Sequence, residues 1–278
     1  YTWNGTAYTT SGTLYVDHHT SLLCLLAIYT LIMLIKTERE RFLIYLPIIS
    51  GIAFLTKSVP TVYIIFSIFL ILTLYIFNKK KFNWFLYLIF SSLSFVILTL
   101  IFFKIENIRF SSFFDQYILF PSSIGKDRYG ELNFLSGGVL FDFKFIYFAF
   151  FPILFINFRN IIKSKKELAS KQFYYFLSLF FLIISLILHQ INTRNQEFIF
   201  FLIPVMCAFS VIYINTANLK FKKYFSIFFM IFCLFVTAKY HVRFNEERRF
   251  HEMTNINFDL SIDAQKIDNK LSGLNWIT

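Results

Sequence analysis

The chain has 278 residues, carries a formal net charge of +11 and is 57% hydrophobic. Charged residues make up 15% of it, against about 25% in a typical soluble domain, so the composition excludes an ordinary soluble protein. Long apolar runs separated by short basic segments instead predict an all-α fold, a polytopic transmembrane helical bundle. The positive charge lies mostly in those segments, where it orients membrane helices, and therefore does not indicate nucleic-acid binding.

About eight membrane spans are predicted, because a span needs about 20 mainly apolar residues. In chain order they cover residues 18–35, 42–57, 60–77, 83–103, 139–157, 173–189, 197–215 and 222–239. The membrane region is thus expected over residues 1–239, followed by a polar tail over 240–278. We interpret the tail either as the start of a soluble domain, with a helix and then a turn over 259–277, or as an unfolded end.

The segments between the spans differ in charge. Four loops, at residues 36–41, 78–82, 158–172 and 216–223, contain 14 lysines and arginines, whereas Lys57, the loop over 104–144 and the turn over 189–197 together contain seven. Basic loops stay on the cytoplasmic side of a membrane. We therefore expect a multi-pass inner-membrane protein of a bacterium. Its periplasmic side would carry Lys57, a long loop over 104–144, the turn after His189 and the tail.

Ionisable residues at the edge of a membrane are costly, and they indicate functional sites. Asp17, in VDHHTSLL, is either the N-cap of the following helix or an acceptor for a substrate hydroxyl or amine. Lys57, in LTKSVP, is either a snorkelling lysine at a helix end or the partner of a phosphate. His18 and His19 are adjacent and point to different faces of a helix, so a metal site is not expected. No other ligand set requires a metal or a cofactor.

Two more polar segments face the same side. Arg128, in IGKDRYGE, is either a solvated loop charge or a bidentate ligand of a phosphate. His189, Arg194 and Glu197, in HQINTRNQE, form either a polar turn with helix caps or the rim of a site that includes Lys57. Within the long loop, FFDQYILF is expected to lie along the membrane surface as a helix.

The chain has no nucleotide-binding motif of the GxxxxGK[ST] or GxGxxG type. An enzyme acting on the outer side has no free nucleotide supply, so it needs a donor already in the membrane, such as a sugar on a lipid phosphate. Lys57 and Arg128 are the cations that could neutralise that phosphate.

Three landmarks resemble the GT-C membrane glycosyltransferases, and most closely the bacterial relatives of the protein O-mannosyltransferases and of the lipid A aminoarabinose transferase. GIAFLTKSVP is similar to the family's LTKGP segment, with Ser58 where glycine is usual. FFDQYILFPSSIGKDRYGE resembles the family's aromatic outer loop with its arginine. FFLIPVMCAF is similar to a YxLPxxPxL helix start, with Phe201 in place of Tyr. The landmarks follow the family's order and span nearly the whole chain.

The resemblance implies an inverting glycosyltransferase that moves a sugar from a polyprenyl-phosphate donor to a lipid A, glycan or protein acceptor at the outer face. It implies that Lys57 and Arg128 bind the donor phosphate and that Asp17 is a secondary acidic residue, with Phe201 on the rim. Some family members bind a divalent metal. The family's main base lies in a loop that would precede Tyr1, so we expect this chain to be part of a longer protein and incomplete for catalysis.

Two other functions remain open. One is a transport or non-enzymatic role, such as flipping a lipid-linked sugar, and the other is a polysaccharide polymerase. A flippase should carry charges along several spans, whereas these spans are nearly free of charge and the polar groups gather at their outer ends. This distribution favours an enzyme at the outer face.

Overall fold

The computed structural model describes residues 16–120, 123, 139–193, 198–217 and 221–247, and in the tail residues 259, 261–266, 269, 272–273 and 275–276. For Asp17 and His18 it describes the backbone alone. The chain divides into two compact units. The larger covers Leu14–Val236, and the residues from Thr237 onward belong to the other.

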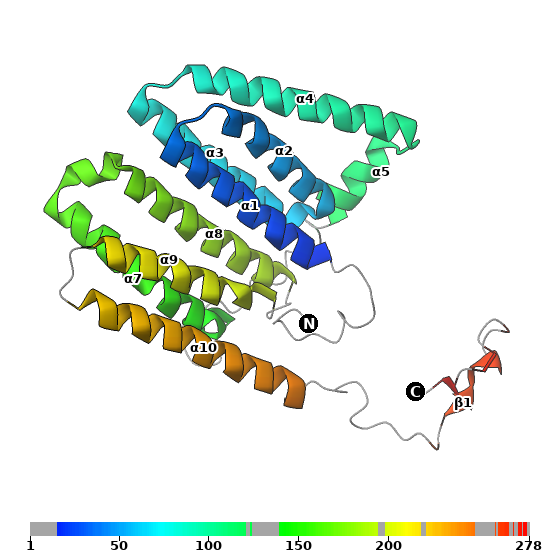
Figure 1. The fold of residues 1–278 in the computed structure, drawn as a ribbon. Helices are drawn as coiled ribbons and strands as arrows, with labels where there is room; N and C mark the ends of the chain where they lie inside the picture. Colours follow the sequence, from blue (N-terminus) through cyan, green and yellow to red (C-terminus); the bar gives the residue numbers. More distant parts are fainter. Residues whose placement is uncertain are drawn as a thin grey trace. The chain divides into compact units, whose positions relative to one another are not determined.

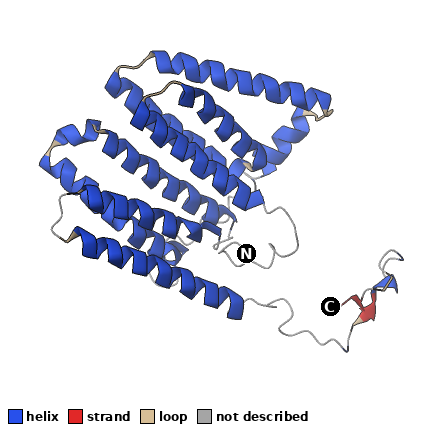
Figure 2. Ribbon diagram, in the orientation of Figure 1, coloured by secondary structure: helices blue, strands red, loops and turns tan. Residues whose placement is uncertain are grey.

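The larger unit is a bundle of α-helices, labelled in Figure 1 and shown with their connecting loops in Figure 2. The helices are α1 (Val16–Thr37), α2 (Arg41–Thr56), α3 (Ser58–Lys79), α4 (Asn83–Ile105), α5 (Phe110–Phe114), α7 (Lys144–Lys163), α8 (Lys171–Thr193), α9 (Leu202–Thr216) and α10 (Lys222–Glu247), which continues past the end of the unit. Apolar side chains dominate their sequences, as the predicted spans require.

Six helical segments of the described residues are long and apolar enough to cross a membrane. They are His19–Thr37, Ser58–Lys79, Asn83–Ile105, Leu140–Lys163, Lys171–Asn192 and Ile199–Thr216. Each matches a predicted span, so the expectation of a helical membrane protein is confirmed. The span predicted at 42–57 is the shorter helix α2, with 16 residues. The span predicted at 222–239 lies within α10, which is not among the six.

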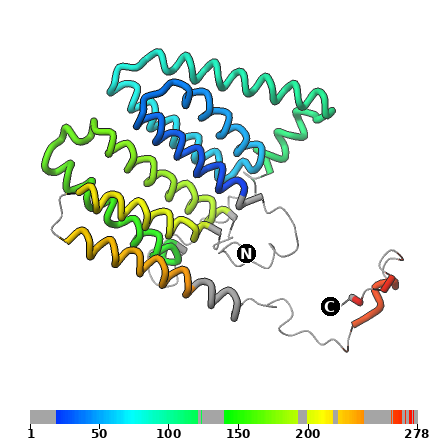
Figure 3. The backbone as a smooth tube through the Cα atoms, in the orientation of Figure 1, coloured from blue at the N-terminus to red at the C-terminus, as the bar shows by residue number. Residues whose placement is uncertain are grey.

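α8 is the central helix of the unit. It contacts α1 and α3 on one side and α7 on the other, and α9 packs against α7; Figure 3 shows this order along the chain's colours. The share of buried residues is 61% in the span of α8 and 6% in the span of α4. α8 therefore belongs to the core, whereas α4 presents most of its surface to the surroundings and contacts α2.

α10 joins the bundle through phenylalanine side chains of α7. The ring of Phe148 lies 4.7 Å from the ring of Phe232 and 5.9 Å from the ring of Phe229, measured between centroids. Aromatic pairs at these distances add stabilisation beyond the area that they bury. The abundant phenylalanine of this chain thus serves helix packing as well as apolarity.

Three of the predicted basic loops, at residues 36–41, 78–82 and 158–172, meet at one end of the bundle, which we call the basic end. Glu38, just after α1, accepts ion pairs from Lys81 at 2.6 Å and from Lys171 at 2.8 Å. Its other partner is the hydroxyl of Tyr75, at 2.9 Å. The ammonium groups of Lys171 and Lys81 lower the pKa of Glu38 from 4.5 to about 2. One carboxylate therefore ties together three of the loops that the charge count assigned to the same side.

The tail differs from its prediction. Ile262–Asp263 (β1) pairs antiparallel with Asn275–Trp276 (β2), and Ala264–Lys266 forms a short 3-10 turn. The helix expected in the first part of 259–277 is wrong over residues 262–266, whereas the turn expected after it agrees with the turn at residues 272–273. Isoleucine and tryptophan favour paired strands, and Gly273, at φ +87°, supplies a left-handed position that favours a turn.

Candidate functional site

Buried polar side chains gather where the first turns of α1 and α3 meet the last turns of α8, and we call this region the polar end. Six of them are at most 6% exposed: Thr20, Ser21, Ser58, Thr61, His189 and Gln190. Burying a polar group in apolar surroundings costs free energy unless it bonds to a partner or a ligand. This concentration makes the polar end the candidate functional site.

Hydrogen bonds between α3, α8 and α1 hold the polar end together. The Nδ2 of Asn192 donates to the hydroxyl of Tyr63 at 2.7 Å, and the Thr61 hydroxyl lies 3.9 Å from the sulfur of Cys24. Deeper in the bundle, the hydroxyls of Ser67 and Ser185 are 3.3 Å apart. These contacts join segments far apart in the sequence and align the start of α3 with the end of α8.

Lys57 lies in the break between α2 and α3. It has extended backbone angles, φ −157° and ψ 124°, and Val59 is also non-helical. Pro60 explains the non-helical angles of Val59, because the proline ring disfavours a helical conformation of the residue before it. The amide of Lys57 donates to the carbonyl of Ala53 at 3.0 Å, and its carbonyl accepts from the Thr61 hydroxyl at 2.9 Å. The backbone of this half-buried lysine is thus fixed from both sides.

The segment FFDQYILF lies beside the same break. It is helical, as predicted, with α5 followed by a π-helical turn over Asp115–Leu119. The hydroxyl of Tyr117 donates to the carbonyl of Leu55 at 2.6 Å. The ring of Phe54 lies 6.1 Å from that of Tyr117. This segment is therefore anchored to the last turn of α2, two residues before Lys57.

The other predicted site residues fall in different places. The backbone of Asp17 lies in the first turn of α1 at the polar end, and its side chain lies outside the described part of the chain. His189 is fully buried within α8, which runs to Thr193, so its assignment to a turn is wrong, and its place at the rim of a site stays a prediction. Phe201 ends a 3-10 turn that contacts α1 and α8. Arg128, Arg194 and Glu197 lie outside the described residues.

Sequence reasoning missed Gln190, Asn192 and Tyr63. Gln190 is 1% exposed, and neither its Oε1 nor its Nε2 has a hydrogen-bond partner among the described residues. The signal was present: HQIN directly follows an apolar run, and helical continuation of that run buries these amides. The prediction ended the helix at the first polar residue and therefore did not use this signal.

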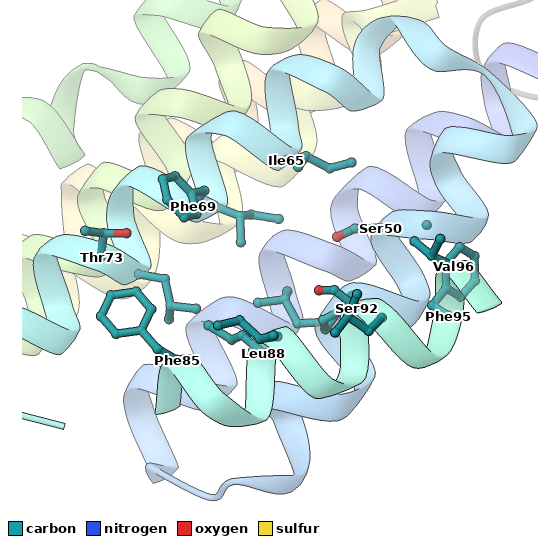
Figure 4. A pocket seen from close by; sticks show the side chains of 16 residues that line it. Ser50, Ile65, Phe69, Thr73, Phe85, Leu88, Ser92, Phe95 and Val96 are labelled. Carbon is teal, nitrogen blue, oxygen red and sulfur yellow. The ribbon is translucent and has the colours of Figure 1, made fainter. Parts of the chain in front are cut away.

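An apolar groove of about 450 Å³ runs between α2, α3 and α4. Figure 4 shows Ile65, Phe69, Leu88 and Val96 on its walls, with the hydroxyls of Ser50 and Ser92 among them. Gly51 allows the ring of Phe95 to lie against α2, because an added Cβ would come within 2.2 Å of that ring.

No protein-family model, curated protein sequence or solved structure matches this chain.

Proposed function

We propose that the protein transfers a sugar from a polyprenyl-phosphate donor to an acceptor at the outer face of the membrane, as a member of the GT-C class. The observation that carries the proposal is the position of Lys57, fixed at a helix break next to the buried polar end. A simple snorkelling lysine needs neither the fixed backbone nor the neighbouring polar groups. The resemblance of GIAFLTKSVP to the family's LTKGP segment supports the same assignment.

Lys57 would bind the phosphate of the donor. Because Lys57 is half-buried, its ammonium would act in a lower effective dielectric than water, and its attraction to a phosphate would be stronger than at an exposed surface. Arg128 is proposed as the second cation. Both would stabilise the charge that develops on the phosphate when the sugar leaves.

The groove between α2, α3 and α4 would hold the prenyl chain. Gly51, which lines it, precedes Lys57 by six residues, which corresponds to about 9 Å along a helix. Ile65 lines the opposite wall on α3. A donor with its phosphate at Lys57 could therefore place its first isoprene units in an apolar channel open to lipid.

The polar end would bind the sugar and the acceptor. Gln190 and Asn192 offer amide groups that suit sugar hydroxyls, and His189 lies on the same turn of α8. The acceptor oxygen would form a bond to the anomeric carbon from the face opposite the phosphate. The bond from that carbon to the phosphate oxygen breaks, and its electron pair leaves with the phosphate. The acceptor's proton passes to a carboxylate, for which Asp17 is the candidate in this chain.

The topology belongs to the same proposal. With the short helix α2 and with α10 added to the six long apolar helices, the chain would cross the membrane eight times. The basic end would face the cytoplasm of a bacterium, because lysine and arginine accumulate there. The polar end would face the periplasm, where lipid-linked donors are the available sugar source.

The proposal is tested by the binding of a labelled polyprenyl-phosphate sugar to the protein reconstituted in lipid vesicles. Loss of a charge-assisted contact of about 1.5–3 kcal/mol corresponds to a loss of affinity of about 10- to 150-fold, which we expect for Lys57→Ala. Lys57→Arg should retain part of the affinity, because it keeps the charge but changes the donor geometry.

Lys104→Ala is the matched control, since Lys104 is an exposed lysine in the last turn of α4 near the same end. Asn157→Ala, in the buried part of α7, serves as a second control. Equal affinities of wild type and Lys57→Ala would contradict the phosphate assignment. Equal losses of donor affinity in Lys57→Ala and Lys104→Ala would show that the effect comes from general surface charge.

A further inference from the structure

A second polar pocket lies at the basic end, between α7, α8 and α9. It has a volume of about 210 Å³ and is lined by Arg159, Asn160 and Lys163 of α7, Gln172 of α8, and Tyr213 and Thr216 of α9. The residues that line it include no carboxylate. The hydroxyl of Tyr213 donates to the carbonyl of Gln172 at 3.1 Å, which holds α9 against the start of α8. We propose that this pocket binds the phosphate of an anionic lipid headgroup.

The two cations of the pocket differ from their neighbours at the same end. Lys81 and Lys171 share one carboxylate, that of Glu38. Neither Arg159 nor Lys163 has an ion-pair partner within the part of the chain that the structure describes. Two uncompensated cations on successive turns of one helix, four residues apart, form a site for a phosphate, which guanidinium and ammonium groups bind through charge-assisted hydrogen bonds.

The helix ends near the pocket leave it positive. α7 and α9 end there, and each C-terminus contributes about −0.5 of an elementary charge, whereas the N-terminus of α8 contributes about +0.5. With two full positive charges from Arg159 and Lys163, the balance stays near +1.5. A phosphodiester with one negative charge therefore finds a favourable potential in the pocket.

The depth of the pocket matches a lipid headgroup. Lys163 and Thr216 are the last residues of their candidate spans, and Gln172 is the second residue of its span. The pocket therefore lies at the level where the apolar part of three helices ends. Its volume equals that of about seven water molecules in the liquid, which leaves room for a phosphate together with bridging waters.

The adjoining face of α7 favours a lipid over a dissolved phosphate. Phe155, Phe158 and Ile162 alternate with the pocket residues along the helix and are 53%, 62% and 70% exposed. On a membrane helix such side chains contact acyl chains. A lipid with its phosphate at Arg159 can lay its chains along this face, and basic pockets between helices at this level are known to favour anionic headgroups.

Native mass spectrometry of the detergent-purified protein tests the proposal, because it counts bound lipids one by one during a titration. We expect phosphatidylglycerol to bind more tightly than phosphatidylcholine. The double variant Arg159→Gln with Lys163→Gln should weaken the binding of the first phosphatidylglycerol by at least about tenfold, because it removes two charge-assisted contacts and the loss of one alone costs about tenfold or more. Arg159→Lys should fall between this variant and wild type, because one fork of hydrogen bonds is lost and the charge is kept.

The matched control is Lys165→Gln with Lys166→Gln, which removes the same charge from exposed positions of the next loop. It should change phosphatidylglycerol affinity less than twofold. Equal losses in the two double variants would overturn the site in favour of diffuse attraction. Displacement of phosphatidylglycerol by equimolar inorganic phosphate would overturn the lipid as its ligand. Thermal melting of each lipid-free variant verifies that the folds are equivalent, so a loss of binding without a loss of melting temperature supports the site.

Discussion

The two ends of the bundle differ in the charge, the location and the exposure of their polar groups. At the basic end the polar groups are charged, lie in loops and are partly exposed, as in the ion pairs of Glu38 with Lys81 and Lys171. At the polar end they are mostly uncharged, lie inside helices and are buried, as His189 and Gln190 are. Charged residues in loops can set the orientation of the helices in a membrane. Buried amides and hydroxyls cost free energy unless they are hydrogen-bonded, which makes the polar end the candidate site.

The largest effect is expected at the basic end, for a substitution that lowers the stability of the protein without changing donor binding. Tyr75 is fully buried, with its ring 5.9 Å from Trp84 and 5.0 Å from Tyr174. Tyr75→Ala should lower the free energy of unfolding by about 3–5 kcal/mol, because it leaves a cavity. Tyr224→Ala, at a 72% exposed position of α10, should have little effect. Both can be measured by unfolding in detergent. A loss of donor affinity in the folded fraction of Tyr75→Ala would show that the basic end also affects donor binding, which contradicts the division between the two ends.

At the polar end, Gln190→Leu should stabilise the protein, whereas Tyr75→Ala destabilises it. Removing a buried amide without partners among the described residues should raise the free energy of unfolding by about 1–3 kcal/mol. If Gln190 contacts the substrate, the same variant should bind the polyprenyl-phosphate sugar more weakly. Unfolding and donor binding are measured on the same sample. A destabilised variant with normal donor binding would assign Gln190 a purely structural role.

The ion pairs at the basic end predict a dependence on pH. Since the folded pKa of Glu38 is about 2 against 4.5 in its ordinary state, its contribution to stability is complete above pH 4.5 and is lost as the pH falls through 2. Glu38→Gln should cost about 1 kcal/mol at neutral pH, and its difference from wild type should shrink over that acid range. Glu40→Gln, in the same turn, is the control. A difference that stays constant down to pH 2 would show that the charge of Glu38 is irrelevant.

The smallest effect is expected in the middle of the bundle, between the basic end and the polar end. A cycle of Ser67→Ala and Ser185→Ala should give a coupling free energy of about 0.6 kcal/mol, typical of a hydrogen bond between membrane helices. Ser94→Ala, which affects only a bond to the carbonyl of Phe90 in its own helix, should show no coupling with Ser185→Ala. A coupling well above 1 kcal/mol would mean that the middle of the bundle, and not its ends, fixes the pairing of α3 with α8.

The sequence predicted the helices better than it predicted their contacts. Apolar length alone located six spans, because each is a local property of about 20 consecutive residues. The pairing of Glu38 with Lys81 and Lys171 depends on residues more than forty positions away, which no local pattern reveals. The charge count still assigned these three loops to the same side.

The candidate site was predicted less completely. Lys57 stood out because a lysine between apolar runs is rare. The end of α8 did not, because polar residues after an apolar run resemble a turn. α8 continues through His189 and Gln190 to Thr193, and Tyr63 of α3 supplies a hydrogen bond to Asn192. This partner lies 129 residues away in the sequence. The assignment of Lys57, Arg128 and Asp17 to sugar transfer stays a prediction.

The shortness of α2 has a consequence for the thickness of the surrounding bilayer. Its 16 residues rise about 24 Å, roughly 6 Å less than the hydrocarbon core. The Ser91 hydroxyl donates to the carbonyl of Ile44, which aligns the ninth residue of α4 with the fourth of α2. α2 therefore begins about 7 Å further in than α4. The missing length is located at the basic end, next to the turn over 38–40 and the ion pairs of Glu38 with Lys81 and Lys171. In the proposed eight-span topology these charged groups would cover the gap, and the surrounding membrane would not need to thin.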